Sequence, residues 1–337
     1  MDNLAPLNFA VTPDELAREK DGPPGGTRFG PLGTMRFCIP PAAKDREDDL
    51  LVDLFYQRDP ALLAKKGLSK VGRYVDHVPE FLEHGDERVP VPTVVVEGRG
   101  NSKLSLKNTG FELVAIDTKA PSTDDLGWAS EVVKEAYERS GRRVREVLVF
   151  DHMVRDSSSK KDNDEVSAPV SRVHCDYTRE SGPKRLKELR PDLSEALEKE
   201  SVEIAFANVW RSTDLDHPVK SWPLALMDPK GIDFSDSTKI LPYDIVYPNR
   251  TGQNYSLGTN VLSYEWYYFK HMTSNEALVF SVFDSDSSRP GTVFHTAFEM
   301  PPDWHQPWTN APPPPGYVPP PNRESIECRT IVVLEKE

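Results

Sequence analysis

The chain has 337 residues, of which 37% are hydrophobic and 28% charged, so a substantial core is possible and a wholly disordered chain is excluded. From the length we expect about two domains or one large β-rich domain. The formal net charge of −13, with no block of basic residues, argues against nucleic-acid binding, and the mean hydropathy of −0.55 argues against a membrane span.

Two further features indicate the compartment. The first residues contain no basic segment followed by a long apolar one, so no secretory signal is expected. Cys38, Cys175 and Cys328 are odd in number and widely spaced, which argues against a disulfide framework and against a structural zinc knuckle. We therefore predict a cytoplasmic protein without nucleic acid or a membrane as partner.

Proline and glycine divide the chain into segments. The stretches 21–41 and 301–321 are rich in these residues, and the second cannot form a helix or a central strand because proline lacks the backbone donor. Apolar residues at helical spacing predict a helix over 126–140, which follows N-cap signals at 121–124 and ends at Gly141. Helical segments are also expected at 185–189 and 192–200, on either side of Pro191.

Short apolar runs predict many strands. In 202–210 the apolar residues Val202, Ile204, Phe206 and Trp210 stand at even positions, which is the period of a half-buried strand. The expected strands are 93–96, 112–116, 144–150, 170–176, 202–210, 224–228, 240–247, 265–270, 278–283, 293–298 and 326–334. No glycine-rich loop joins a strand to a helix, so a dinucleotide or P-loop site is not expected. The pattern predicts a mostly β fold with flanking helices (α+β), such as a sandwich or jelly roll.

One segment carries polar residues of chemical interest. His174 and Asp176 are two positions apart in 170–178, and on an extended strand this spacing places both side chains on one face. An imidazole and a carboxylate on one face are two ligands of a metal site, and His295, in a strand-like run far downstream, is the best candidate for the third. Two histidines and one carboxylate leave coordination positions open, which suits non-haem Fe(II). The alternative is a strand with two satisfied polar side chains.

The same residues carry a resemblance to a known family. His-x-Asp, a distant His and then Arg-x-Ser resemble the iron(II)- and 2-oxoglutarate-dependent dioxygenases. More narrowly, the chain resembles the family grouped around the AsaB-like hydroxylase/desaturases, the fungal gibberellin desaturase and the cephem-methoxylase subunit CmcJ. The matching stretches are SRVHCDYT (171–178), FANVWR (206–211), PLALMD (223–228), EWYYFKHM (265–272), FDSD (283–286), FHTAFEMP (294–301) and RESIECR (323–329), with a loose match at 29–37.

The resemblance implies a double-stranded β-helix, a cupin-like jelly roll whose mouth holds Fe(II) on His174, Asp176 and His295. It implies a catalytic domain over 121–337 and an N-terminal extension and support region over 1–120, packed on the core. The tract 301–321 is then either a lid over the mouth or a surface excursion.

The co-substrate 2-oxoglutarate and O2 would take the open positions of the iron. The far carboxylate of 2-oxoglutarate needs a buried cation, for which the planar fork of arginine is well suited. Arg323, with Ser325 in an Arg-x-Ser pair, is the first candidate. Arg329, on the same strand face, is the second, and Arg211, after Asn208 and Trp210, is the third.

The implied activity is oxidation of an unactivated C–H bond of a small-molecule substrate, coupled to decarboxylation of 2-oxoglutarate to succinate and CO2. Hydroxylation, desaturation and oxidative cyclisation all stay open, as do the substrate and the oligomeric state. Two other readings are possible. One is a non-catalytic partner subunit that binds substrate for another oxygenase or methyltransferase, and the other is a zinc-dependent hydrolase or lyase that uses the same three ligands.

Overall fold

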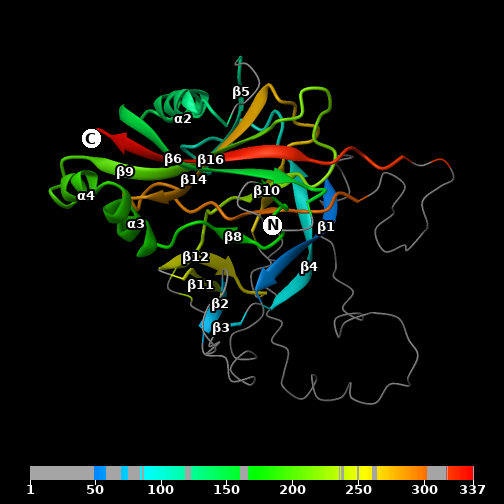
Figure 1. The fold of residues 1–337 in the computed structure, drawn as a ribbon, viewed down its shortest axis with the longest axis horizontal. Coiled ribbons are helices and arrows are strands. Elements are labelled where there is room, and N and C mark those ends of the chain that lie inside the picture. Colours follow the sequence, from blue (N-terminus) through cyan, green and yellow to red (C-terminus); the bar gives the residue numbers. More distant parts are fainter. Residues whose placement is uncertain are drawn as a thin grey trace, which may run out of the picture. The chain divides into compact units, whose positions relative to one another are not determined.

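Two β-sheets form the framework of the described part of the chain (Figure 1). The structure, a computed structural model, describes residues 49–57, 70–74, 84–85, 87–117, 123–159, 166–234, 236, 239–248, 250–259, 264–301, 316 and 318–336. All of these residues belong to one compact unit, Arg46–Glu337.

The larger sheet has ten strands in the order β1-β4-β13-β10-β15-β8-β12-β11-β2-β3. Its strands are β1 (Leu50–Gln57), β2 (Lys70–Tyr74), β3 (His84–Gly85), β4 (Arg88–Glu97), β8 (His174–Cys175), β10 (Leu224–Met227), β11 (Ile240–Val246), β12 (Thr251–Leu257), β13 (Trp266–Tyr268) and β15 (His295–Ala297). The smaller sheet has six strands in the order β5-β14-β9-β16-β6-β7. These are β5 (Phe111–Ala115), β6 (Val144–Asp156), β7 (Val166–Ser167), β9 (Glu203–Ser212), β14 (Glu276–Asp284) and β16 (Glu324–Leu334).

The chain passes repeatedly from one sheet to the other. It crosses from β7 to β8 and from β8 to β9, and again from β9 to β10, from β13 to β14, from β14 to β15 and from β15 to β16. Such alternation of neighbouring strands between two facing sheets is the connectivity of a jelly roll wound as a double-stranded β-helix. The strand density of the sequence thus predicted the architecture correctly.

Most predicted strands are present with shifted ends, and three differences stand out. The run 170–176 is paired as a strand only at His174–Cys175. The strands β1 and β12 were not predicted, although β1 pairs with β4 over its whole length. β12 escaped detection because its sequence, TGQNYSL, is polar, while its second half is nevertheless buried.

The two faces of β9 serve two different cores. Phe206 and Trp210 belong to the large core cluster that also contains residues of the ten-stranded sheet, such as Leu226 and Trp266. Ala205, Ala207 and Val209, one position out of phase, belong to a second cluster with helix α2. In a strand, residues two positions apart share a face. The even positions of β9 therefore face the space between the sheets, and the odd positions face α2.

Helix α2 (Gly127–Arg139) covers the outer face of the six-stranded sheet, where it contacts β6, β9 and β16 (Figure 1). Its buried positions include Trp128, Val132 and Val133, as the helical spacing predicted. The predicted N-cap at 121–124 lies too early in the chain. The residue at the N-cap position is Leu126, whose side chain cannot accept a hydrogen bond, and the Asp125 carboxylate instead accepts from the Gly127 N–H. Gly141 ends the helix at a φ of +92°, which glycine adopts without strain.

Helices α3 (Ser181–Leu189) and α4 (Pro191–Glu198) follow β8. The break at Pro191 was predicted, because proline fits the first turn of a helix but not its interior. These two helices occupy the connection between β8 and β9, so they lie immediately after the His-x-Asp segment.

Strands from both sides of residue 120 pair with one another. β4 pairs with β13, and β5 pairs with β14. The division of the chain at residue 120 stays a prediction. The stretch 21–41 and most of the tract 301–321, with its predicted lid, lie outside the described residues. Among the residues that are described, no helix is both long enough and apolar enough to cross a membrane.

A buried ionic group ties β14 to β9. Arg142 donates to Asp284 at 2.8 Å and to Glu203 at 2.6 Å, and the side chains of Arg142 and Asp284 are both almost fully buried. Burial raises the pKa of Asp284 to about 6, although the Arg142 charge partly offsets this effect. The carboxyl therefore keeps its proton in the folded state at pH values where the unfolded chain has lost it.

This arrangement predicts a pH-dependent stability that the Asp284→Asn variant lacks. Because the folded pKa exceeds the ordinary value of 3.8, the contribution is present below about pH 4 and is lost as the pH rises through 6. That difference corresponds to about 3 kcal/mol. Urea unfolding should show the wild type losing this much stability relative to Asp284→Asn between pH 4 and pH 7. The exposed Asp216→Asn variant is the control, and parallel curves for wild type and Asp284→Asn would contradict the prediction.

Candidate metal and co-substrate site

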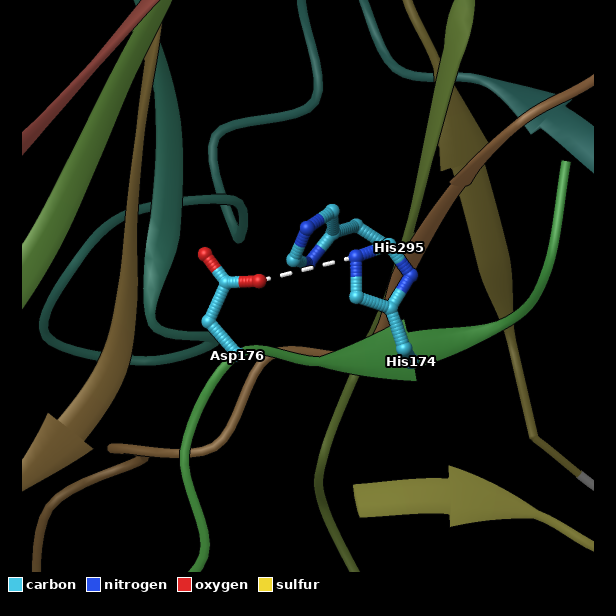
Figure 2. A group of neighbouring side chains, drawn as sticks. All are labelled: His174, Asp176 and His295. Carbon is cyan, nitrogen blue, oxygen red and sulfur yellow. Dashed lines mark ion pairs between the residues drawn. The ribbon is translucent and has the colours of Figure 1, made fainter. Parts of the chain in front are cut away.

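Three side chains from distant parts of the sequence meet between the two sheets. β8 and β15 are adjacent antiparallel strands in which His174 stands directly opposite His295, and the centroids of the two rings are 4.4 Å apart. Asp176 follows β8 by one residue, and its Oδ1 lies 3.5 Å from Nε2 of His174. Figure 2 shows the three side chains pointing toward one another, and one potential ligand atom from each lies within 4.8 Å of the others.

The backbone fixes the tautomer of both imidazoles. Nδ1 of His174 lies 2.7 Å from the Arg172 carbonyl oxygen, and Nδ1 of His295 lies 3.2 Å from the Val293 carbonyl oxygen. Because a carbonyl only accepts, each Nδ1 carries the proton and each Nε2 keeps a free lone pair. Burial, together with the neighbouring His295 and Arg172, lowers the pKa of His174 well below its ordinary value. His174 is therefore a neutral nitrogen donor of the kind that metals bind, and in both rings Nδ1 is engaged by the backbone, which leaves Nε2 as the ligand atom.

The carboxylate of Asp176 is held by one oxygen. Its Oδ2 accepts from Nδ2 of Asn208 at 2.8 Å and from Nε of Arg329 at 3.2 Å. Burial by itself raises the pKa of Asp176, but the Arg329 charge, the two neighbouring imidazoles and the hydrogen bond from Asn208 outweigh it and hold the pKa well below the ordinary range. Asp176 is thus an anion whose Oδ1 is turned toward the histidines. This donor set, two imidazole nitrogens and one carboxylate oxygen, fits a divalent iron ion.

Arg323 is a buried cation with no carboxylate partner among the residues that the structure describes. It is only 3% exposed, and its Nη1 donates to the Trp222 carbonyl oxygen at 2.6 Å. Its guanidinium carbon lies 5.6 Å from the centroid of the Trp210 ring. Among the described residues its Nε has no hydrogen-bond partner, and neither has the buried Oγ of Ser325 two residues on. Burial lowers the pKa of Arg323 to about 9. These orphaned donors fit a ligand carboxylate.

Strand β9 connects these donors to the three clustered ligands. Asn208 and Trp210 are two positions apart on the face that points between the sheets. Asn208 donates a hydrogen bond to Asp176, and the guanidinium of Arg323 lies over the Trp210 ring. The orphaned arginine and the three ligand side chains therefore open onto the same interior.

Arg329 is engaged differently from Arg323. Besides Asp176, it donates from Nη1 to Asp151 at 2.7 Å, and its Nη2 lies 3.5 Å from Glu327. Burial alone lowers the pKa of Arg329, but Asp176 and Glu327 raise it well above the ordinary value. Its charge is thus already neutralised by the protein.

Arg211 lies on the other face of β9. It is fully buried, donates to the Ser274 carbonyl oxygen, and has its guanidinium carbon 5.0 Å from the Trp128 ring of α2. Its odd position places it on the same face of β9 as Ala205, Ala207 and Val209, which pack against α2. The structure therefore brings Arg323, Ser325 and Arg329 toward the clustered ligands, but not Arg211.

Sequence reasoning gave no role to three residues that contact the site. Asn208 and Glu327 hold Asp176 and Arg329, and Phe280 packs its ring 4.8 Å from that of His295. A signal existed for Asn208, because an amide at an inward position between Phe206 and Trp210 is unusual in an apolar strand.

Three solved structures of one enzyme are similar to this fold. An iron and alpha-ketoglutarate-dependent endoperoxidase, NvfI, matches in a different conformation with a TM-score of 0.67 and 19% identity, covering 86% of this chain and 100% of that chain. A second structure of NvfI gives 0.66 and 18% over 86% and 99%, and a tryptophan-to-phenylalanine variant gives 0.66 and 20% over 86% and 98%. At these identities the likeness establishes the fold, and the predicted mostly β jelly roll with flanking helices is confirmed.

Comparison with curated proteins gives no match. A family model covers most of the chain. It matches residues 69–333, a span that includes both sheets from β2 to most of β16 and all the site residues described above. The chain is therefore a member of the YDMC family, described as the oxidoreductase/YMDC permease-like domain.

Proposed function

We propose that this protein is an Fe(II)- and 2-oxoglutarate-dependent oxygenase that oxidises an unactivated C–H bond of a small specialised metabolite. The observation that carries this proposal is the pairing of two features in one interior. Two histidines and one ionised aspartate converge there, and Arg323, which has no carboxylate partner among the described residues, is buried at the same interior. An oxidoreductase-like family and the NvfI-like fold support the same reaction class.

In this proposal His174, Asp176 and His295 hold the metal. Ferrous iron supplies oxygen activation coupled to decarboxylation of 2-oxoglutarate to succinate and CO2. The protein orients both imidazoles through the backbone carbonyls, and it keeps Asp176 ionised and oriented through Asn208 and Arg329. Zinc hydrolysis would use the same ligands, but it gives no reason for an unpaired arginine in the same interior.

Arg323 and Ser325 hold the far carboxylate of 2-oxoglutarate. The Nε of Arg323 and the hydroxyl of Ser325, which have no hydrogen-bond partner among the described residues, can donate to the two oxygens, and the buried setting strengthens each hydrogen bond. Arg329, which is already neutralised by Asp176 and Asp151, positions the metal ligand instead. Arg211 anchors α2 to β9.

The finer assignments belong to the proposal as well. The motifs shared with the AsaB-like, gibberellin desaturase-like and CmcJ-like hydroxylase/desaturases favour hydroxylation, desaturation or oxidative cyclisation. NvfI is named an endoperoxidase, and peroxide formation is a further outcome of the same iron chemistry. We place the protein in the cytoplasm with a small molecule as its partner.

One experiment tests the reaction class. Protein reconstituted without oxygen with Fe(II) and 2-oxoglutarate should develop a weak visible charge-transfer band, and oxygen should then release succinate. A well-folded, iron-loaded protein without the band would contradict the proposal. Succinate formation by the isolated chain excludes a purely non-catalytic subunit. Activity that persists without oxygen, in protein that purifies with zinc, would instead establish the hydrolase or lyase.

The ligand variants have a clear expected outcome. His174→Ala and Asp176→Ala should abolish binding of Mn(II), an oxygen-stable substitute for Fe(II), because each removes one of three ligands. Isothermal titration calorimetry measures the loss, and circular dichroism checks that the sheets remain. His217→Ala, at an exposed histidine, is the control and should bind Mn(II) like the wild type. Equal Mn(II) affinity in all variants would place the metal elsewhere.

Asn208→Ala tests how Asp176 is positioned. Without the amide, Oδ2 of Asp176 is held by Arg329 alone, so the carboxylate gains freedom to rotate. We expect Mn(II) affinity to fall about 10- to 100-fold, the usual effect of removing such a supporting contact. Ser212→Ala on the same strand is the matched control. Unchanged affinity in Asn208→Ala would show that Arg329 suffices.

Arg323→Met separates function from stability. Methionine fills the space with an apolar chain and removes a buried, unpaired charge, so the variant should unfold at the same or a higher temperature than the wild type without ligand. Adding 2-oxoglutarate with Mn(II) should raise the Tm of the wild type but not of Arg323→Met, with at least a 30-fold loss of affinity expected from removing a buried charged partner. A variant that still responds to 2-oxoglutarate would remove Arg323 from the co-substrate site. Ser212→Ala again serves as the control.

A further inference from the structure

A cavity outside the metal and co-substrate positions opens on Asp176. Its volume is about 120 Å³, and its lining includes Asp176 and Arg329 together with residues of α3 and of the hairpin formed by β11 and β12. α3 packs against β12, so the cavity is bounded by structured elements. A molecule in this cavity would lie directly beside a proposed metal ligand.

The wall of this cavity is positively charged. Four basic side chains line it, against three acidic ones. Arg329 is neutralised by Asp151 and Asp176, and Arg185 pairs with Glu188 at 3.0 Å. The remaining two, Lys184 and Arg250, have no carboxylate within ion-pair distance in the part of the chain that the structure describes. This local surplus lies in a chain whose net charge is −13, so it is opposite to the overall charge.

The uncharged part of the lining combines apolar or aromatic side chains with polar ones, Ser181, Thr251, Gln253 and Asn254. Phe150, Tyr177, Ile245 and Tyr247 all contribute. The guanidinium carbon of Arg250 lies 4.2 Å from the centroid of the Tyr247 ring, and this stacking limits the positions that the charge can take. Tyr177 packs edge-on against Phe206, with centroids 4.8 Å apart, so it forms a fixed wall next to Asp176. The apolar and aromatic side chains on one part of the wall, with oriented charges beside them, suit a small molecule that has both an apolar and a charged part.

From these observations we propose that the substrate is an organic anion, a carboxylate carried on an apolar or aromatic body, which Lys184 and Arg250 bind in the cavity beside Asp176. The inference rests on the proposed oxygenase function, because it assigns the substrate of that site. The carboxylate pairs with the two free cations, while the apolar body lies along Tyr177 and Phe150 and directs its C–H bonds toward the metal ligands.

A second cavity provides the internal comparison. It is larger, about 680 Å³, it shares Tyr177 with the first, and it is also lined by cations, including Arg179 and Lys230. None of the three clustered ligands lines it. An anion bound in this second cavity would lie away from Asp176. Variants of Arg179 and Lys230 are therefore matched controls for variants of the cations in the first cavity.

The test measures binding rather than turnover. The probe is 4-fluorobenzoate, observed by 19F NMR on protein loaded with Zn(II), and the uncharged isostere 4-fluorobenzamide is the ligand control. We expect the benzoate to bind wild type more tightly than the amide. Lys184→Gln and Arg250→Gln should each weaken benzoate binding at least fivefold without changing amide binding, and Arg179→Gln and Lys230→Gln should leave both unchanged.

Replacing Zn(II) with Mn(II) locates the probe. A benzoate bound beside Asp176 should show strong paramagnetic broadening of its 19F signal in the wild type, and addition of 2-oxoglutarate should leave its affinity intact. The proposal is overturned if benzoate fails to bind, if the amide binds equally well, or if only Arg179→Gln or Lys230→Gln weakens binding. Failure of the protein to take up either metal, with the charge dependence intact, would contradict the oxygenase function and leave the anion site standing.

Discussion

The antiparallel pairing of β8 with β15 is the contact on which the site depends. It places His174 directly across from His295, and because Asp176 leaves β8 one residue later, the carboxylate turns back toward both rings. β8 and β15 are short, so their register is maintained by the longer neighbours β10 and β12 on either side. A slip of one residue would turn one imidazole to the other face of the sheet, since side chains alternate along a strand.

The site is built at a cost to the stability of the fold. Arg323 is a charged group in the interior without a counter-ion among the described residues, and such a group carries an effective penalty of several kcal/mol. The Arg142 group shows that this chain can neutralise a buried arginine when the role is structural, because two carboxylates meet it. This contrast between the two arginines supports the proposal that Arg142 is structural and that Arg323 binds a ligand.

The sequence pattern predicted much of this arrangement, and the contacts that it did not predict depend on residues far apart in the chain. The period of two in β9 was predicted correctly. The same period places Arg211 on the opposite face of the strand from Asn208 and Trp210, away from the clustered ligands. Arg323 and Arg329, in contrast, share a face and cannot be told apart by pattern. What separates them is Asp151 and Asp176, which reach Arg329 from other strands. Such long-range partners leave no trace in local sequence.

The charge of the whole chain is a poor guide to its cavities. A net charge of −13 suggests repulsion of anions, yet local groups dominate inside a cavity, where low-dielectric walls reduce screening. Asp176 contributes a negative charge to the cavity, but Arg329 already offsets it, and a divalent metal held as proposed would offset it further. In the proposed function the three ligands and the cations of the cavity would therefore act together, and metal binding would increase the attraction for an anionic substrate.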